Sequence, residues 1–180
     1  MRRRGWLALI LLAPLAVIAI GTQVAALTGL VGIAQTALAG RSRDSAQLER
    51  GVGTIRLAAD VLDRTWSSPA ARVLEYNPMT LGAMDDLRGG AHALAVGTRV
   101  LDPLAEIVAV GVGFDGLPPI ARGTTIDPLK AEALARPVAE VHSTLAATGA
   151  ALAEVDGSGV LGRPIGALTE SIAGSVADLT

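Results

Sequence analysis

The chain has 180 residues, of which 51% are hydrophobic, 18% are charged and only 2% are aromatic. Because aromatic side chains usually supply much of a globular core, this composition predicts a core of aliphatic and small side chains, which suits closely packed helices better than a sheet sandwich. There is no cysteine, which excludes disulfides and lipid attachment at a cysteine. Beyond the first four residues, 12 basic residues stand against 17 acidic ones, a balance that argues against a nucleic-acid partner.

The first forty residues predict a membrane anchor. Arg2, Arg3 and Arg4 are followed by residues 5–40 without any charge, and the densest apolar part is Trp6–Ile20. A basic cluster favours the cytoplasmic side, and about 20 apolar residues cross a hydrocarbon layer of about 30 Å. We therefore expect the three arginines to set the topology, with the N-terminus in the cytoplasm and the C-terminus outside. Trp6 is expected to anchor the helix at the membrane interface, where tryptophan is favoured.

A cleaved secretory signal is the alternative. Such a signal has an apolar region of about 7–15 residues followed by a small-x-small site, and both Val24–Ala26 and Ala37–Ala39 fit such a site. The uncleaved anchor is favoured because the apolar character persists from Trp6 to Ala26, which is spanning length. In either case the rest of the chain is expected to be extracytoplasmic.

Beyond the anchor, apolar residues recur at spacings of three and four, as is typical of helices packed side by side. One seam continues in phase from the anchor and predicts a single membrane-proximal long helix over residues 27–66, which would rise about 60 Å above the bilayer if unbroken. Its weak point is residues 40–43, where two seam positions are polar and a break or hinge is expected. The seam consists of Ile20, Val24, Leu27, Val31, Ala34, Leu38, Leu48, Val52, Ile55, Ala59, Leu62 and Trp66.

Residues 67–180 are predicted to form further helices, punctuated by a capping residue followed by proline. Ser68–Pro69, Asn77–Pro78 and Asp127–Pro128 have this pattern, and a Gly- and Pro-rich stretch near 111–125 predicts the loop of a helical hairpin. Two further seams consist of Met84, Leu87, Ala91, Leu94, Thr98, Leu101, Ala105 and Val108, and of Leu134, Val138, Val141, Leu145, Thr148, Leu152 and Val155.

Two internal prolines predict irregularities in helices, and the end of the chain predicts a further helix. Asp102–Pro103 predicts a kink, or a restart with Asp102 as cap, and Pro137 predicts a bend. A last helix is expected from about Pro164, and it runs to Thr180 without a Gly cap, a basic last turn or a polar tail. We therefore expect the chain to be the membrane-proximal part of something longer, or a truncated copy of it.

The predicted fold class is all-α: an N-terminal transmembrane helix continuing into an elongated antiparallel, coiled-coil-like helical bundle. Residues 1–26 form the cytoplasmic arginine cluster and signal-anchor, residues 27–66 the long helix, and residues 67–180 the extracytoplasmic bundle.

A dinucleotide-binding pattern, G-x-G-x-x-G, occurs at Gly111–Gly116 after an apolar run. The chemistry needs a helix N-terminus directly after the glycines, to hold the pyrophosphate, and a carboxylate about 20 residues later. Leu117, Pro118 and Pro119 disfavour that helix, and the preceding run belongs to a helical seam. A flexible hairpin loop is the favoured interpretation.

The other residues that could take part in catalysis or metal binding are interpreted as ordinary helix or loop residues. His92 and His142 fall inside predicted helices without a second ligand at the i, i+4 spacing of a helical metal pair. Asp156–Gly159 does not fit G-x-S-x-G. The charges that flank the seams are expected on solvated helix faces, in i, i+3 or i+4 pairs; they are Asp60, Asp63, Arg64, Asp85, Asp86 and Arg88. No catalytic site, cofactor or metal is predicted.

Several short motifs resemble an uncharacterised family of membrane-anchored bacterial proteins, common in actinobacteria and classed as a domain of unknown function. The resemblance covers the N-terminal helical part and implies a larger C-terminal domain that this chain lacks; it supplies no catalytic residues. Its motifs are the arginine-rich start with the anchor, Trp66–Pro69, Asn77–Gly82, Asp86–Arg88, Ile126–Leu129 and Glu154–Asp156.

The sequence thus predicts a non-enzymatic stalk or interaction module of the cell envelope, held in the bacterial cytoplasmic membrane by one helix. Its expected partners are the lipid bilayer, and either another envelope protein or a second copy bound through the helical seams. A ligand-sensing helical ectodomain that works with a partner protein is the alternative. An enzyme acting on envelope glycans would need paired carboxylates in a cleft, and is the least favoured hypothesis.

Overall fold

The computed structural model describes residues 2–75, 81–116, 118–122 and 125–155, and over these residues the all-α class is confirmed. A short antiparallel ladder in the loop before α6 pairs Ala121 with Ile126 and Arg122 with Thr125. The expected last helix and Asn77–Pro78 lie outside the described residues. The elements are α1 (Arg2–Ser42), α2 (Ser45–Trp66), α3 (Pro69–Glu75), α4 (Leu81–Gly97), a 3-10 turn η1 (Thr98–Val100), α5 (Leu101–Val112), β1 (Ala121–Arg122), β2 (Thr125–Ile126), α6 (Pro128–Ala133) and α7 (Ala135–Ala153).

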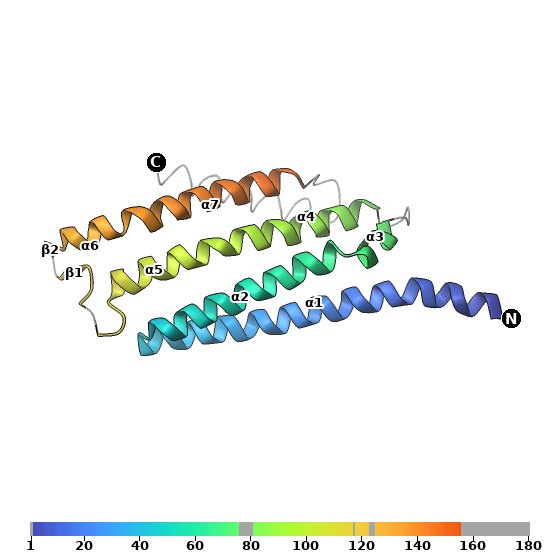
Figure 1. The fold of residues 1–180 in the computed structure, drawn as a ribbon, viewed down its shortest axis with the longest axis horizontal. Coiled ribbons are helices and arrows are strands. Elements are labelled where there is room, and N and C mark those ends of the chain that lie inside the picture. The colour runs from blue at the N-terminus through green and yellow to red at the C-terminus, as the bar shows by residue number, and fades with distance from the viewer. Residues whose placement is uncertain (1, 76–80, 117, 123–124, 156–180) are drawn as a thin grey trace.

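The long helices lie side by side in one row (Figure 1), in the order α1, α2, α4 with α5, and α6 with α7. At one end of the row, α3 closes onto α1: Ile18, Ala71 and Leu74 are buried together, with Trp66 and Met84 partly buried against them. The N-terminal part of α1 extends beyond this end (Figure 1). A single row cannot enclose a thick core, and most of its buried apolar residues are alanines.

The single helix expected over residues 27–66 is corrected to two helices. α1 ends at Ser42, Arg43 adopts a left-handed conformation with φ of 52°, and α2 runs back along α1 from Ser45. The break falls at the predicted hinge, where Asp44 caps α2 by accepting a hydrogen bond from the Gln47 backbone N–H at 3.0 Å. The rise of about 60 Å expected for an unbroken helix therefore does not occur, because the chain reverses at this break.

Glycines allow α1 and α2 to approach closely. A Cβ atom added at Gly32 would lie 2.7 Å from Ile55 Cγ1 and 2.9 Å from the Gly51 carbonyl oxygen, and one added at Gly51 would lie 2.8 Å from the Thr36 backbone nitrogen. Across the same interface, Thr54 Oγ1 lies 3.1 Å from Gln35 Oε1. The hairpin therefore depends on small side chains at these crossing points.

Local signals set the remaining helix ends as predicted. The Ser68 side chain accepts from the Ala71 backbone N–H at 3.3 Å and opens α3, and Asp127 accepts from the Leu129 N–H at 3.1 Å and opens α6. Pro137 lies in the first turn of α7, after a break at Leu134, because proline cannot donate to the carbonyl four residues earlier.

Asp102–Pro103 marks a restart, although Asp102 is not its cap. The helix tightens into η1 before α5, and Asp102 lies in the first turn of α5 with its carboxylate paired to Arg56 of α2.

Candidate functional site

The predicted anchor residues Arg2, Arg3, Arg4 and Trp6 lie in the first turns of α1, at the end that extends beyond the row (Figure 1). Within the described part of the chain, one helical segment, Ala13–Ser42, is long and apolar enough to cross a membrane, with a mean hydropathy of 1.9. The core helix of a soluble protein or a signal sequence can satisfy the same criterion, but only 17% of this segment's apolar window is buried.

The two sides of α1 differ in side-chain size. Toward α2 it presents small residues, among them Gly32, Ala25 and Ala39, which are buried. The opposite side carries large apolar residues, each about half exposed or more; we call this side the outer face of α1. Its members are Leu15, Val17, Ile20, Val24, Leu27, Leu30, Val31 and Leu38.

Asp86 contradicts the expected solvated position. Asp86 is 1% exposed, and neither carboxylate oxygen has a hydrogen-bond partner among the residues that the structure describes. Asp86 precedes Gly89, Ala93 and Gly97 at helical spacing, on the side of α4 where Gly89 approaches Val155 and Gly97 approaches Thr148 of α7. Its position on this closely packed face explains the burial, and a buried unpaired carboxylate carries a large desolvation cost.

Among the neighbouring charges, Asp85 and Arg88 form the predicted i, i+3 pair. Asp63 does not follow the prediction: its side chain is only 27% exposed, and it faces a histidine of another helix. Arg88 Nη1 lies 3.7 Å from Asp85 Oδ1, an i, i+3 pair near the surface. His92 Nδ1 lies 3.6 Å from Asp63 Oδ1 of α2, and the His92 side chain is 56% exposed. Over the described ranges, these residues do not combine with others into a group of three or more metal-ligating side chains.

The Gly111–Gly116 stretch is a turn that holds two parts of the fold together. Gly111 and Val112 end α5, and Gly113 and Asp115 have positive φ angles of 78° and 55°. The Asp115 backbone N–H donates to the Arg43 carbonyl at 2.9 Å, and its carboxylate accepts from the Ser45 N–H at 3.1 Å. We call this contact the Asp115 latch.

The Asp115 latch favours the ionised form of the Asp115 carboxyl. Hydrogen bonds from the Ser45 side chain and backbone lower the pKa of the Asp115 carboxyl below its usual value, because they favour the ionised form. A helix C-terminus together with a carboxylate also repels phosphate, since both are negative. The geometry therefore agrees with the structural loop and disfavours dinucleotide binding.

Two grooves lie beside α5. The first, of about 400 Å³ between α2 and α5, has the acidic residues Glu49, Asp102 and Glu106 among its lining residues. The second, of about 560 Å³ between α5 and α7, is apolar except at His142; its lining residues are Leu104, Ile107, Ala135, Val138, Ala139, Val141 and His142.

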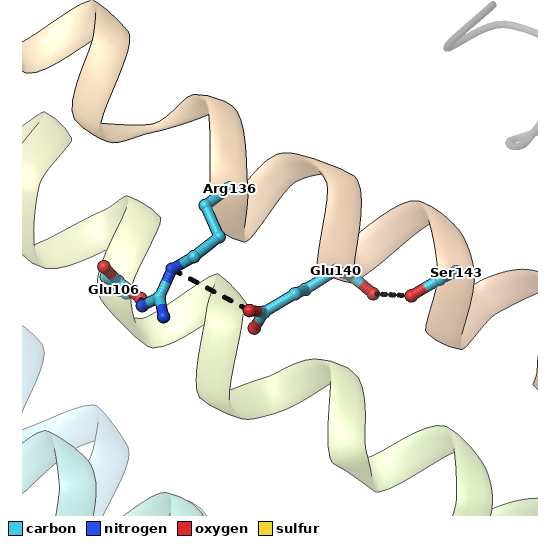
Figure 2. Close-up of polar contacts among 4 residues, drawn as sticks. All are labelled: Glu106, Arg136, Glu140 and Ser143. Atoms are coloured by element: carbon cyan, nitrogen blue, oxygen red, sulfur yellow. Dashed lines mark hydrogen bonds and ion pairs between the residues drawn. The ribbon is translucent and has the colours of Figure 1, made fainter.

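A small polar cluster ties α5 to α7 (Figure 2). Arg136 of α7 reaches Glu106 of α5 at 3.5 Å and Glu140, one turn along α7, at 3.8 Å. Ser143 Oγ donates to the Glu140 backbone carbonyl at 3.0 Å. Because Arg136 is 74% exposed, these ion pairs contribute only about 0–1 kcal/mol each and serve mainly to orient the helices.

Comparison of the chain with known protein families, with curated proteins and with solved structures gives no match in any of the three. The resemblance to a family of unknown function therefore stays a prediction from the motifs.

Proposed function

We propose that this chain is a single-pass, membrane-anchored extracytoplasmic helical module of a bacterial cell-envelope protein, with its N-terminus in the cytoplasm and its row of helices acting as a stalk or interaction surface. The observation that carries the proposal is the division of α1 into a small-residue side toward α2 and a large, apolar outer face. Soluble helices direct large apolar side chains inward. Helices that contact lipid commonly do the reverse, because small residues let them approach each other.

The uncharged part of α1 sets how deeply the helix inserts. Because Arg2, Arg3 and Arg4 are proposed to stay in the cytoplasm, the hydrocarbon begins near Gly5, and about 20 residues, to near Val24, are needed to cross about 30 Å at 1.5 Å per residue. Because α3 packs on α1 at Ile18, the end of the row with Trp66 and α3 would then reach the outer membrane interface, where tryptophan is favoured. The module would rise about 27 Å above the hydrocarbon, from Val24 to Ser42.

Membrane extraction of the full-length protein tests this proposal. We expect the chain to stay in the membrane pellet after alkaline carbonate washing and to retain its N-terminal residues by intact-mass measurement. A soluble protein whose mass begins after Ala26 or Ala39 would instead establish the cleaved-signal hypothesis.

A ligand-sensing ectodomain that works with a partner protein is the second candidate, and the apolar groove between α5 and α7 favours it. Its volume of about 560 Å³ is within the range of small-molecule sites, roughly 300–1,000 Å³. Thermal-shift measurements with apolar small molecules test this function, with Val138→Trp as a variant that fills the groove. Stabilisation that Val138→Trp abolishes would support sensing, and equal shifts in both proteins would dismiss the groove.

A further inference from the structure

Part of the outer face of α1 lies beyond the depth that lipid reaches. With the proposed anchorage, about 20 residues from Gly5 cross the hydrocarbon, which ends near Val24. Leu27, Leu30 and Val31 are further along α1 and are 66%, 62% and 53% exposed. A contiguous apolar surface of this kind in water marks an interaction site.

The exposed residues follow a heptad repeat. Residues at seven-residue intervals from Val17, and residues three positions after them, are all exposed, while Gly32 and Ala39 on the α2 side occupy other heptad positions. The seam seen in the sequence therefore exists on α1, but it points away from α2. Its first set is Val17, Val24, Val31 and Leu38, and its second set is Ile20, Leu27 and Ala34.

The residue types identify the partner. Valine dominates the first set and leucine or isoleucine occurs in the second, the combination that favours parallel two-stranded coiled coils. Two copies anchored with the same topology are parallel by necessity. Residues 5–40 carry no charge, so two identical faces meet without repulsion and carry no charge pattern that would select a different protein.

The seam is small, so pairing is expected only between copies held in the same membrane. From Val17 to Leu38 it is about 32 Å long, and a helix about 10 Å wide buries on the order of 300 Å² per copy over that length. The area buried by both copies together is smaller than the roughly 1,200–2,000 Å² that stable interfaces between soluble proteins bury. Confinement of both copies to one membrane raises their effective concentration and offsets this shortfall.

We infer, building on the proposed membrane anchorage, that a second copy of this chain covers the outer face of α1, and that the two α1 helices form a parallel coiled coil. The contacting residues are Val17, Ile20, Val24, Leu27, Val31, Ala34 and Leu38.

Disulfide formation in membranes tests this pairing directly, because the chain has no native cysteine. Full-length variants Leu27→Cys, Val31→Cys and Ala34→Cys place a thiol on the seam. Ala26→Cys and Ile33→Cys are matched controls, since both residues are exposed at similar heights but line a groove between α1, α2 and α4. Mild oxidation should yield several-fold more covalent dimer at all three seam positions than at the controls.

Three results would overturn the inference: equal dimer at seam and control positions, no dimer at the seam, or dimer at one seam height only, which indicates antiparallel pairing. A covalent product with a protein of another mass would also overturn it. As a second variant pair, Val31→Arg should abolish chemical crosslinking of the otherwise unmodified chain in membranes, whereas Ile33→Arg should retain it.

Fractionation of the same cells separates this inference from the proposed function. A membrane-bound chain without seam crosslinks would overturn the dimer alone. Seam dimers recovered in the soluble fraction would overturn the anchorage and leave the pairing intact.

Discussion

The buried carboxylate of Asp86 costs free energy in the folded chain, because both oxygens lose water without gaining a hydrogen bond from the described part of the chain. We expect Asp86→Asn, which keeps the shape and removes the charge, to raise the free energy of unfolding by about 1–3 kcal/mol. Thermal unfolding of the detergent-solubilised protein, followed by circular dichroism, measures this change.

The adjacent Asp85 provides the control for Asp86. Its side chain is 59% exposed and pairs with Arg88 at the surface, so Asp85→Asn should change the stability by less than about 0.5 kcal/mol. Destabilisation by Asp86→Asn would contradict this account and would mean that the carboxylate holds a charged partner.

The Asp115 latch carries a pH dependence whose sign follows from its lowered pKa. The ionised carboxyl is favoured in the fold, so the stabilisation is complete above the unfolded pKa of about 3.9 and disappears as the pH falls through the lower folded pKa. Hydrogen exchange at the Ser45 amide, corrected for intrinsic rates, should lose protection only in that acidic window.

Asp115→Asn isolates the charge in this test, because asparagine also tolerates the positive φ of this position. The variant should weaken Ser45 protection at neutral pH and remove its acid dependence. An unchanged acid dependence in Asp115→Asn would show that another group titrates.

The roles of Asp86 and Asp115 could not be assigned from the sequence. Asp86 sits among charged neighbours, and only its spacing to Gly89, Ala93 and Gly97 hinted at a closely packed face. Asp115 contacts Ser45 across 70 positions of the chain, and no local pattern encodes that contact.

At the level of elements, the α1–α2 hairpin depends on glycines at particular positions. Gly51→Ala should destabilise the protein by about 1–3 kcal/mol, because its Cβ would lie 2.7 Å from Thr36 Cγ2 and 2.8 Å from the Thr36 nitrogen. Gly53→Ala, two residues further along α2 and with none of the described side chains within 4 Å of its added Cβ, should stabilise α2 by about 0.5–1 kcal/mol. Denaturation of both variants in detergent measures the difference, and equal stabilities would argue that the helices do not cross here.

Helix ends were predictable where the signal is local. Ser68 and Asp127 cap the helices that follow them, and Pro137 lies just after a break, because each effect acts within one turn. The course of the chain after Ser42 was not predictable from the seam. The spacing of apolar residues identifies the apolar face of a helix but not what that face contacts. The seam on α1 faces outward and the seam on α2 faces inward, yet in the sequence the two read as one continuous seam.

At the level of the molecule, the row of helices has one layer over the described residues, with apolar surface left on α1 and between α5 and α7. The composition anticipated the small-residue core. Because a single layer leaves apolar surface exposed, the module gains stability from what covers that surface, namely lipid and, by our inference, a second copy.

Topology is the most direct test of the membrane-anchored module. Gly5→Cys keeps all three arginines and marks the start of α1, and Ala46→Cys marks an exposed position near the α1–α2 turn. With a membrane-impermeant maleimide on intact spheroplasts, Ala46→Cys should be labelled at once and Gly5→Cys only after permeabilisation. Labelling of Gly5→Cys without permeabilisation would contradict the account.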